Sequence, residues 1–445
     1  MNYTDLLLDG MGRFESQPLT DDLLHQVKRC ILDWVGVASA GGRVIERKVA
    51  PLQAIASKGP CSVFTSANRF DLSTASLINS MAAHEIELDD GNRFGMIHVG
   101  SVIITAMIAV AQHECLSSQQ FFKGVISGYQ VAIRLAKQVQ PYLKRKGIHA
   151  TGSCGSVAVA YAVAKALGLD RNQTKNAISA ASVRAGGLMQ WLDSSSEFKD
   201  YSAGGAVNNG VISAFLAKGG FQGAIDPLGD KRGFVSVFSP EAALNCDLWD
   251  NDSPEILNVY FKPYVSCRHC HAPAEAVLLL KTKYGIRWQD VTGIRVETYR
   301  LAIGGHDNKE IDSVGAAKMS IPYCVAVSLF SGSCGLDSFS EGMISNNDVK
   351  AITHLVNVVE DEGLTILSPR KRGAIVSITT RDGVTYSEYV DNPLGEPENP
   401  MSDQMLEEKY WELVSFAGVD RPRAEMMRSM IWNLESEFNE FIGLL

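Results

Sequence analysis

Apolar residues recur every three to four positions along most of the chain, which is the spacing of amphipathic helices. The segment from Thr20 is typical, because Thr20 can cap a helix and two acidic residues follow it in the first turn. Ser117 and Asp170 are candidate caps of the same kind. The helices expected from this pattern are Asp5–Phe14, Thr20–Ala38, Arg43–Lys58, Leu72–Leu88, Val99–His113, Ser117–Val139, Val157–Leu167, Gln173–Gly187, Gly204–Lys218, Met405–Ala417 and Arg423–Ile442.

The pattern changes near Leu257, where segments rich in Val, Ile and Tyr predict β-strands. A hairpin over Ala374–Val390 is the clearest of them, because Asp382-Gly383 is a strong two-residue turn signal. The other elements expected here are strands at Asn258–Val265, Val291–Leu301 and Thr353–Glu360 and helices at Ala272–Tyr284 and Ala317–Phe330.

These elements predict a mainly α fold with two domains. A large all-helical domain would comprise residues 1–256 plus 396–445, and a smaller α+β domain, residues 257–395, would be inserted into it. Ligand sites are common in clefts between domains, so the functional site is expected there.

Composition and charge exclude several classes of function. The net charge of −9 argues against nucleic-acid binding, although it leaves a carboxylate substrate open because local cations decide that. The longest apolar run, Val99–Ala111, is too short to span a bilayer. The first residues carry no secretory signal pattern, and nine scattered cysteines fit reduced thiols, so a cytoplasmic protein is expected.

An acidic segment that leads to a histidine is the first candidate site. Glu87, Asp89 and Asp90 precede a glycine turn, and His98 stands at the mouth of the predicted buried helix. Carboxylates can orient an imidazole and make it more basic, whereas a helix N-terminus lowers its pKa. A solvated acidic helix end is the alternative interpretation.

The second candidate is His149, which precedes a predicted helix at Val157–Leu167. Thr151, Ser153 and Ser156 are candidate caps of that helix, and its N-terminal N–H groups would favour an anion. A titratable imidazole beside an anion site suggests proton transfer on an acidic small molecule. A capped helix after a histidine without a catalytic role is the alternative.

Basic side chains provide two further candidates. Lys199 lies in the polar segment Ser194–Tyr201, where it could bind a carboxylate or be a solvated surface lysine. Lys262 precedes a proline, and Arg268, His269 and His271 crowd the start of a helix. Cationic groups clustered there could hold a substrate carboxylate and stabilise charge that develops on it.

The Cys267-x-x-Cys270 pair suggests a metal, but it supplies only two ligands and no second pair at zinc-finger spacing follows. An iron–sulfur centre would need further cysteines, such as Cys154 or Cys324. Nucleotide-binding, metalloprotease and nucleophile-elbow motifs are missing. The sequence therefore predicts neither a bound metal nor a nucleotide cofactor.

Together these segments resemble the 2-methylcitrate dehydratase / cis-aconitate decarboxylase family (MmgE/PrpD), and the order and spacing hold along the whole chain. The family's acidic pair with a downstream histidine is similar to the segment AHEIELDDGNRFGMIHVG, and Lys199 stands where the family carries a lysine. The chain departs from the family's pattern at three positions. Gly91 stands where the decarboxylase has a threonine, Cys267 stands where it has a histidine, and Val99 replaces the proline that usually follows the first histidine. The other matching elements are His-Ala-Thr-Gly-x-x-Gly at His149–Gly155, Lys-Pro-Tyr-x-x-Cys-Arg-His at Lys262–His269 and Ser-x-Pro-Tyr at Ser320–Tyr323.

The resemblance implies a helical domain with an α+β lid domain, a homodimer, and a cofactor-free site in the cleft that acts on small di- or tricarboxylates. Members of the family include hydro-lyases, a decarboxylase and an epimerase of iminodisuccinate. Position by position, the resemblance points to Glu87, His98, His149, Lys199, Lys262 and Tyr323. The expected catalytic residues are His98, His149, Lys199, Lys262 and Tyr323, and the expected substrate-binding residues are Glu87, Thr151, Arg268, His269 and Cys267.

The expected function is a metal-independent acid–base enzyme that breaks a bond next to a carboxylate, with dehydration placed first and epimerisation or decarboxylation next. Lysines and helix N–H groups would stabilise the charge, and an imidazole would move the proton. Two rivals remain open: an iron–sulfur hydro-lyase using Cys267 and Cys270, and a helical binding protein without turnover.

Overall fold

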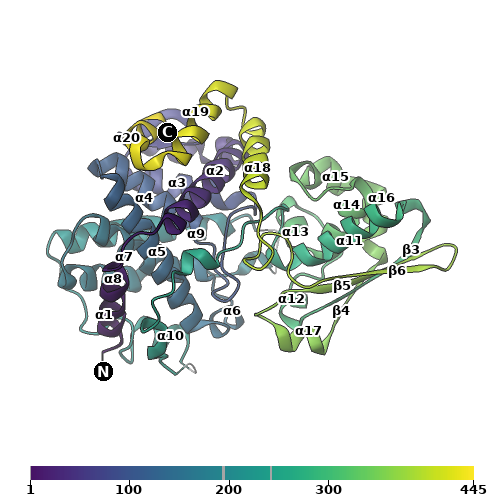
Figure 1. The fold of residues 1–445 in the computed structure, drawn as a ribbon, viewed down its shortest axis with the longest axis horizontal. Coiled ribbons are helices and arrows are strands. Elements are labelled where there is room, and N and C mark those ends of the chain that lie inside the picture. Colours follow the sequence, from purple (N-terminus) through teal and green to yellow (C-terminus); the bar gives the residue numbers. More distant parts are fainter. Residues whose placement is uncertain (1, 193–195, 241–242) are drawn as a thin grey trace.

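Helices packed around one apolar core make up the larger part of the molecule (Figure 1). The computed structural model describes residues 2–192, 196–240 and 243–445, and these are mainly α-helical, as the sequence predicts. Helices α4 (Gly100–Glu114) and α7 (Ala150–Ala166) are buried along almost their whole length, so they are apolar on every side. The other helices of this part are α1 (Tyr3–Glu15), α2 (Asp21–Ile55), α3 (Leu72–Glu85), α5 (Ser118–Val139), α6 (Tyr142–Arg145), α8 (Arg171–Arg184), α9 (Lys199–Lys218) and α10 (Phe234–Phe238). A short hairpin of β1 (Lys58–Val63) and β2 (Ser66–Phe70) joins α2 to α3.

Helix starts follow the predicted caps. The side chain of Thr20 accepts a hydrogen bond from the backbone N–H of Leu23. Ser117 and Asp170 each form a complete capping box, which pairs the otherwise free N–H groups of the first turns of α5 and α8. The local polar pattern therefore fixed these three helix boundaries.

The prediction of two helices over residues 20–58 was wrong, because a single 35-residue helix, α2, covers this stretch. The glycine pair Gly41-Gly42 stands between the two predicted helices, and both glycines are buried inside the single helix. A Cβ atom at Gly41 would lie 1.9 Å from the carbonyl oxygen of Ala82 in α3. The glycines therefore let α2 and α3 pack closely rather than ending a helix.

A four-stranded mixed sheet forms the second part of the molecule, with its own apolar core. Strand order is β4-β3-β5-β6, with β4 parallel to β3 and the other pairs antiparallel. Helices α11 (His271–Tyr284) and α14 (Ile321–Ser331) pack against one face (Figure 1). The strands are β3 (Val291–Thr298), β4 (Val356–Glu360), β5 (Ala374–Thr380) and β6 (Thr385–Val390), and the short helices are α12 (Arg300–Ile303), α13 (Val314–Met319), α15 (Glu341–Ser345), α16 (Asn347–Leu355) and α17 (Glu362–Leu367).

The predicted hairpin is confirmed, since β5 and β6 pair across Asp382-Gly383 and Gly383 has a φ of +83°. The predicted strand Asn258–Val265 was wrong. In the described part of the chain, this segment forms no strand, and its β-pairing is an isolated bridge between Tyr260 and Gly91. Val259 belongs to the helical core and Val265 to the core of the sheet part, so apolar residues are frequent here because the segment crosses between the two cores.

The last three helices return to the first part of the molecule. Residues of α18 (Asp403–Phe416), α19 (Arg421–Trp432) and α20 (Leu434–Leu444) belong to the same apolar cluster as the N-terminal helices. Figure 1 shows α18 beside α2 on the side that faces the sheet-bearing lobe, and α19 and α20 at the end of the helical part away from the sheet.

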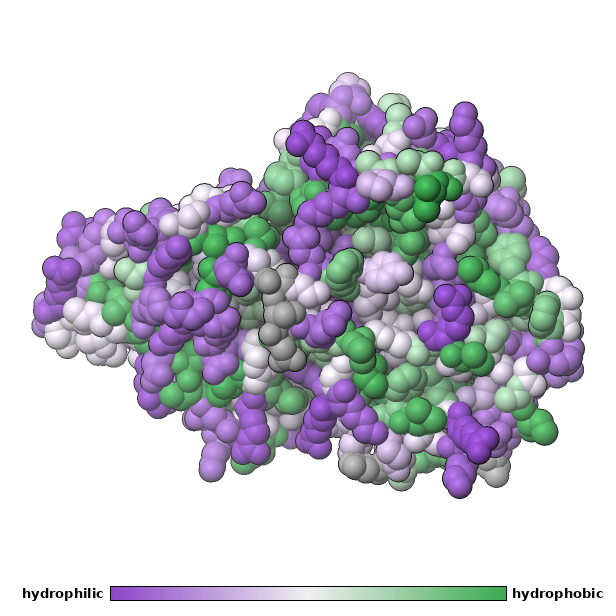
Figure 2. Space-filling view, turned by 180° about the vertical axis from the view of Figure 1, so that it is seen from behind, coloured by the Kyte–Doolittle hydropathy of each residue, from purple (hydrophilic) through white to green (hydrophobic). Residues whose placement is uncertain are grey.

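The surface carries mixed polarity. Figure 2 shows hydrophilic side chains over most of the narrower, sheet-bearing lobe and hydrophobic side chains scattered across the helical lobe. Among the described residues, no helix is both long enough and apolar enough to cross a membrane.

Candidate active site

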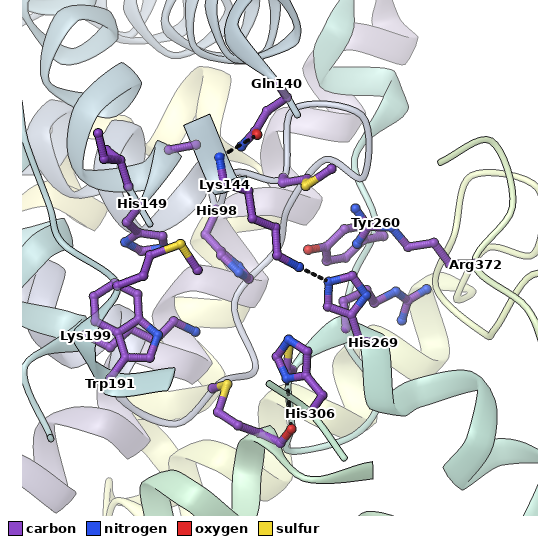
Figure 3. A pocket seen from close by; sticks show the side chains of 17 residues that line it. His98, Gln140, Lys144, His149, Trp191, Lys199, Tyr260, His269, His306 and Arg372 are labelled. Atoms are coloured by element: carbon purple, nitrogen blue, oxygen red, sulfur yellow. Dashed lines mark hydrogen bonds between the residues drawn. The ribbon is translucent and has the colours of Figure 1, made fainter. Parts of the chain in front are cut away.

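A pocket with about 630 Å³ of empty space lies where the helical part meets the part that carries the sheet. His98, His149 and Lys199 reach it from the helical part, and His269, His306 and Arg372 from the other part (Figure 3). A neighbouring pocket, lined by His84 and Glu87, shares Trp191 and Lys199 with the first. Segments far apart in the sequence therefore converge at one site.

Glu87 is held by two lysines at the inner end of this site. Lys262 Nζ lies 3.2 Å from Glu87 Oε2 and 3.6 Å from Asp89 Oδ1, and the Lys199 ammonium binds the other oxygen of Glu87. Burial alone would raise the pKa of the Glu87 carboxyl, but Lys199 and Lys262 hold it well below its ordinary value. The same carboxylates outweigh the burial of Lys262 and raise its pKa. Glu87 and Lys262 are therefore both charged at neutral pH.

Glu87 also has an unusual backbone. Its φ is +56°, in the left-handed region, where a non-glycine residue costs about 1–3 kcal/mol. It directly follows the C-cap of α3, and this turn carries its carboxylate to the two lysines. The site thus holds Glu87 in a conformation that its local sequence does not favour.

Three imidazoles lie next to this group. The ring of His84 is 4.9 Å from that of His98 and 5.5 Å from that of His149. Asp89 bridges the first two, with Oδ2 2.7 Å from His84 Nδ1 and Oδ1 3.3 Å from His98 Nδ1. Among the residues that the structure describes, His84 Nε2 is buried and has no hydrogen-bond partner. Asp89 therefore lies against two imidazoles, and the Asp90 carbonyl oxygen, 3.0 Å from His98 Nδ1, is the hydrogen-bond acceptor that orients His98.

The start of α4 fixes the position of His98. Asp90 accepts hydrogen bonds from the Gly100 N–H at 2.7 Å and from the Tyr129 hydroxyl at 2.6 Å. The backbone N–H of His98 donates to Thr151 Oγ1 at 3.1 Å, which connects the starts of α4 and α7. The pairing of the two helices thereby places His98 beside His149.

The predicted capping role of Thr151, Ser153 and Ser156 was wrong. Helix α7 already begins at Ala150, and all three residues lie inside it. Ser153 and Ser156 donate back to carbonyl oxygens four residues earlier, so they satisfy themselves within the helix. The residue at the N-cap is His149, whose side chain makes no capping hydrogen bond and lines the pocket instead.

Burial keeps the catalytic imidazole candidates neutral. Burial lowers the pKa of His98 to about 4, although Asp89 opposes this. Burial, with His84 and Lys199 nearby, lowers the pKa of His149 well below its ordinary value. His149 Nδ1 lies 3.3 Å from Ser202 Oγ, and the indole of Trp191 meets the ring edge-on. Both imidazoles are therefore available as bases at neutral pH.

The opposite end of the pocket holds a second group of side chains. Lys144 Nζ lies 3.0 Å from His269 Nε2, and His269 Nδ1 lies 2.6 Å from the Tyr299 hydroxyl. His306 Nδ1 donates to the Met319 carbonyl oxygen at 2.9 Å (Figure 3). Burial, with Lys144 nearby, lowers the pKa of His269 well below its ordinary value and that of His306 to about 3.

The structure brings nine of the ten predicted site residues into or beside this site. Lys262 is fully buried behind Glu87, and Thr151 is buried below His98. Tyr323 lies apart, because its hydroxyl donates to the Ser338 carbonyl oxygen and its ring packs on Phe339 in the core of the sheet part. The predicted residues that line a pocket are Glu87, His98, His149, Lys199, Cys267, Arg268 and His269. Residues 194 and 195 of the predicted polar segment lie outside the described residues, and Lys199 itself begins α9.

Sequence reasoning missed four side chains of the site: His84, Lys144, His306 and Arg372. His84 stands within the quoted acidic segment, five residues before Asp89, so a histidine this close to the carboxylates could have indicated it. The other three are single polar residues, and nothing in the surrounding sequence distinguishes them from surface groups.

Two groups of described residues have donor atoms close enough to bind a metal ion, namely His84, Asp89 and His98 in one and Cys267, His269 and His306 in the other. In the second group Cys267 is accompanied by imidazoles and not by a second thiol. Cys270 is fully buried and belongs to neither group.

Comparisons with known proteins agree with this geometry. Residues 11–247 match the model of the MmgE/PrpD N-terminal domain, and residues 264–436 match that of the MmgE/PrpD C-terminal domain. The chain is 25% identical to a cis-aconitate decarboxylase of Aspergillus terreus over 94% of its own length and 90% of the relative. It is 25% identical to the cis-aconitate decarboxylase of Mus musculus over 88% of its length and 82% of the relative. A probable 2-methylcitrate dehydratase of Saccharomyces cerevisiae is 28% identical over 54% of this chain and 49% of the relative.

Proposed function

Because the chain belongs to the MmgE/PrpD family, we propose that it is an enzyme that moves a proton at a carbon atom next to a carboxylate of a small di- or tricarboxylate. One observation carries the proposal: two neutral imidazoles, His98 and His149, face one pocket beside a lysine that is bound to a buried carboxylate. Names of relatives support the substrate class, since they act on cis-aconitate or 2-methylcitrate.

Removal of the proton adds negative charge to the neighbouring carboxylate of the substrate. Lys199 lines the pocket and would stabilise that charge. Lys262 has no exposed surface, so we assign it a positioning role, in which it holds Glu87 ionised and Glu87 holds Lys199 in place. His98 or His149 would take the proton as general base.

We place dehydration first among the reactions. In dehydration a C–H bond breaks next to a carboxylate, the hydroxyl leaves the adjacent carbon with a proton as water, and a C=C bond forms. This step needs a base and an acid, and one pocket imidazole can serve as each in turn: the neutral form takes the proton from carbon, and the imidazolium so formed gives a proton to the leaving hydroxyl. Tyr323 is not needed as the acid, because its hydroxyl is engaged elsewhere.

Decarboxylation is the second candidate. Here CO₂ leaves and the electron pair that remains on carbon takes one proton, so a single acid suffices. The observation in its favour is that the relatives named cis-aconitate decarboxylase match 88% to 94% of this chain, whereas the named dehydratases match about half.

Three expectations about the whole protein are also proposals: a homodimer, a cytoplasmic location, and residues 257–395 acting as a lid on residues 1–256 plus 396–445. Light scattering on purified protein tests the first, and fractionation of the source cells tests the second. Small-angle scattering with and without a bound polycarboxylate tests the third, because closure of a lid reduces the radius of gyration.

Incubation in deuterated water tests the proposed chemistry. The acids to compare are 2-methylcitrate, cis-aconitate and iminodisuccinate, each followed by NMR. We expect one of them to be converted, with deuterium entering the carbon next to a carboxylate in substrate or product. His113→Gln, which changes a surface histidine, is the matched control and should behave as the unaltered protein. Absence of both label and conversion across the panel would contradict the proposal.

The acid side of the pH profile provides a second prediction. Because burial lowers the pKa of His98 to about 4, its base form persists as the pH falls below the ordinary histidine value. We expect kcat/KM to stay constant down to about pH 5 and to fall below it as the imidazole is protonated. Circular dichroism over the same range separates this loss from acid unfolding. A midpoint near 6.5 would show that the base is not one of the buried imidazoles.

A further inference from the structure

The two ends of the pocket differ in charge balance. At the inner end, the ammonium groups of Lys199 and Lys262 face the carboxylates of Glu87 and Asp89, so the cations are already neutralised. An anionic substrate gains little net attraction there. Any strong electrostatic attraction must therefore come from another part of the wall.

Lys144 and Arg372 provide an excess of positive charge at the opposite end. Lys144 binds His269 Nε2 and the Leu301 carbonyl oxygen, and Arg372 donates to the Arg93 carbonyl oxygen. Within the described ranges, neither cation has a carboxylate within ion-pair distance. The hydrogen bonds that their side chains make to described residues are all to neutral acceptors.

The nearby acidic groups are already in use. Glu396 binds both Arg93 and Arg268, at 2.8 and 2.9 Å, and Glu398 also binds Arg93. Arg372 is only 5% exposed, and a buried cation without a counter-charge is costly. Burial, with a smaller contribution from Arg372, lowers the pKa of Lys144 to about 8. A bound anion would supply the counter-charge that Arg372 lacks and would favour the charged form of Lys144.

We propose that Lys144 and Arg372 bind a second carboxylate of the substrate, at the end of the pocket away from Glu87. This inference rests on the proposed function and specifies it: the substrate carries at least two carboxylates, and the one held here is not the one beside the reacting carbon. Lys144 and Arg372 set its orientation, and His269 holds Lys144 in place through the hydrogen bond from the ammonium.

The alternative to an anion at this end of the pocket is a metal ion bound by Cys267, His269 and His306. Two features oppose it. His269 Nε2 already accepts the hydrogen bond of Lys144, so a metal would have to displace an ammonium group. A divalent cation would also lie beside the unneutralised charge of Lys144 and Arg372. The charge balance therefore favours an anion.

Calorimetric titration with tricarballylate, a tricarboxylate without a hydroxyl to eliminate, tests whether Lys144 and Arg372 bind a carboxylate. Because a hydrogen bond to a charged group contributes enough for a tenfold to hundredfold change in affinity, we expect Lys144→Met and Arg372→Met each to weaken binding by about 10- to 100-fold. The matched controls are Lys146→Met and Arg370→Met, which remove exposed cations from the same segments and should bind as the unaltered protein does. Arg372→Lys keeps the charge and should retain most of the affinity if Arg372→Met fails to fold.

Acids with fewer carboxylates test whether the affinity depends on a second carboxylate. Succinate should depend on Lys144 as tricarballylate does, whereas propionate, with one carboxylate, should bind weakly and lose little affinity in Lys144→Met. His149→Gln should still bind tricarballylate, so failure of the proposed chemistry and failure of carboxylate binding by Lys144 and Arg372 give different results. Binding of tricarballylate unchanged in both Met variants, or absent from the unaltered protein, would overturn the proposal. So would one equivalent of Zn²⁺ bound by the protein and lost in Cys267→Ala and His306→Ala.

Discussion

Replacement of Lys262 by methionine is expected to lower the free energy of unfolding by about 3–5 kcal/mol, the range for breaking a buried ion pair on one side. Lys262 is fully buried and its ammonium lies 3.2 Å from Glu87 and 3.6 Å from Asp89. Without it, Glu87 keeps only Lys199, and Asp89 keeps only the two imidazoles beside it. Two buried carboxylates would then carry charge with one lysine between them.

Urea unfolding followed by circular dichroism measures this effect, and a double-mutant cycle isolates it. Glu87→Gln alone leaves Lys262 near Asp89, and the double variant removes the carboxylate and ammonium together, so it should be more stable than the two single losses predict. Arg287→Met is the matched control, because it breaks an exposed pair with Asp290 and should cost less than about 1 kcal/mol. A loss in Lys262→Met no larger than in this control would contradict the assignment of Lys262 to a structural pair with Glu87.

Glu87→Gln should also change how stability depends on pH. The pKa of Glu87 is depressed in the folded protein, so its contribution is present above the ordinary carboxyl pKa and is lost as the pH falls through the folded value. The unaltered protein therefore loses this contribution on acidification, and the variant has none to lose. The difference in unfolding free energy between the two should shrink toward low pH.

Helix boundaries could be read from the sequence where a local rule decided them. The caps Thr20, Ser117 and Asp170 and the turn at Asp382-Gly383 depend on residues a few positions apart, and the structure agrees with each. The helix boundary predicted around the glycine pair in α2 was wrong, because the role of these glycines depends on the carbonyl of Ala82 in another helix. Local pattern cannot distinguish a glycine that ends a helix from one that admits a neighbour.

In the candidate site, too, the residues marked by a local sequence pattern could be predicted, and those defined by distant contacts could not. The segments that carry His98 and His149 could be recognised because each places a histidine just before a buried apolar helix. Thr151, which joins the starts of α4 and α7, explains why the two histidines meet. Lys144 and Arg372 could not be recognised, because their significance lies in the carboxylates that they lack, and only the assembled structure shows which partners are within reach.

Replacement of His149 by glutamine is expected to reduce kcat by about 10²–10⁴, the usual contribution of a positioned acid or base. His149 lines the pocket at the N-cap of α7, makes no capping hydrogen bond, and stacks on His84 at 5.5 Å. Because no cap is lost, we expect the fold to be retained, and thermal unfolding checks this. His98→Gln should lose activity to a similar degree.

The two histidine variants also assign the roles when deuterium exchange is measured beside turnover. The general base is the residue whose loss abolishes both exchange and turnover, because no proton then leaves carbon. Loss of the acid stops turnover while exchange continues, since the carbanion still forms and is reprotonated from solvent. His113→Gln, at an exposed position, is the matched control for the substitution itself. Turnover within about threefold of the unaltered protein in both His98→Gln and His149→Gln would remove the imidazoles from the mechanism, since a positioned acid or base contributes far more than that.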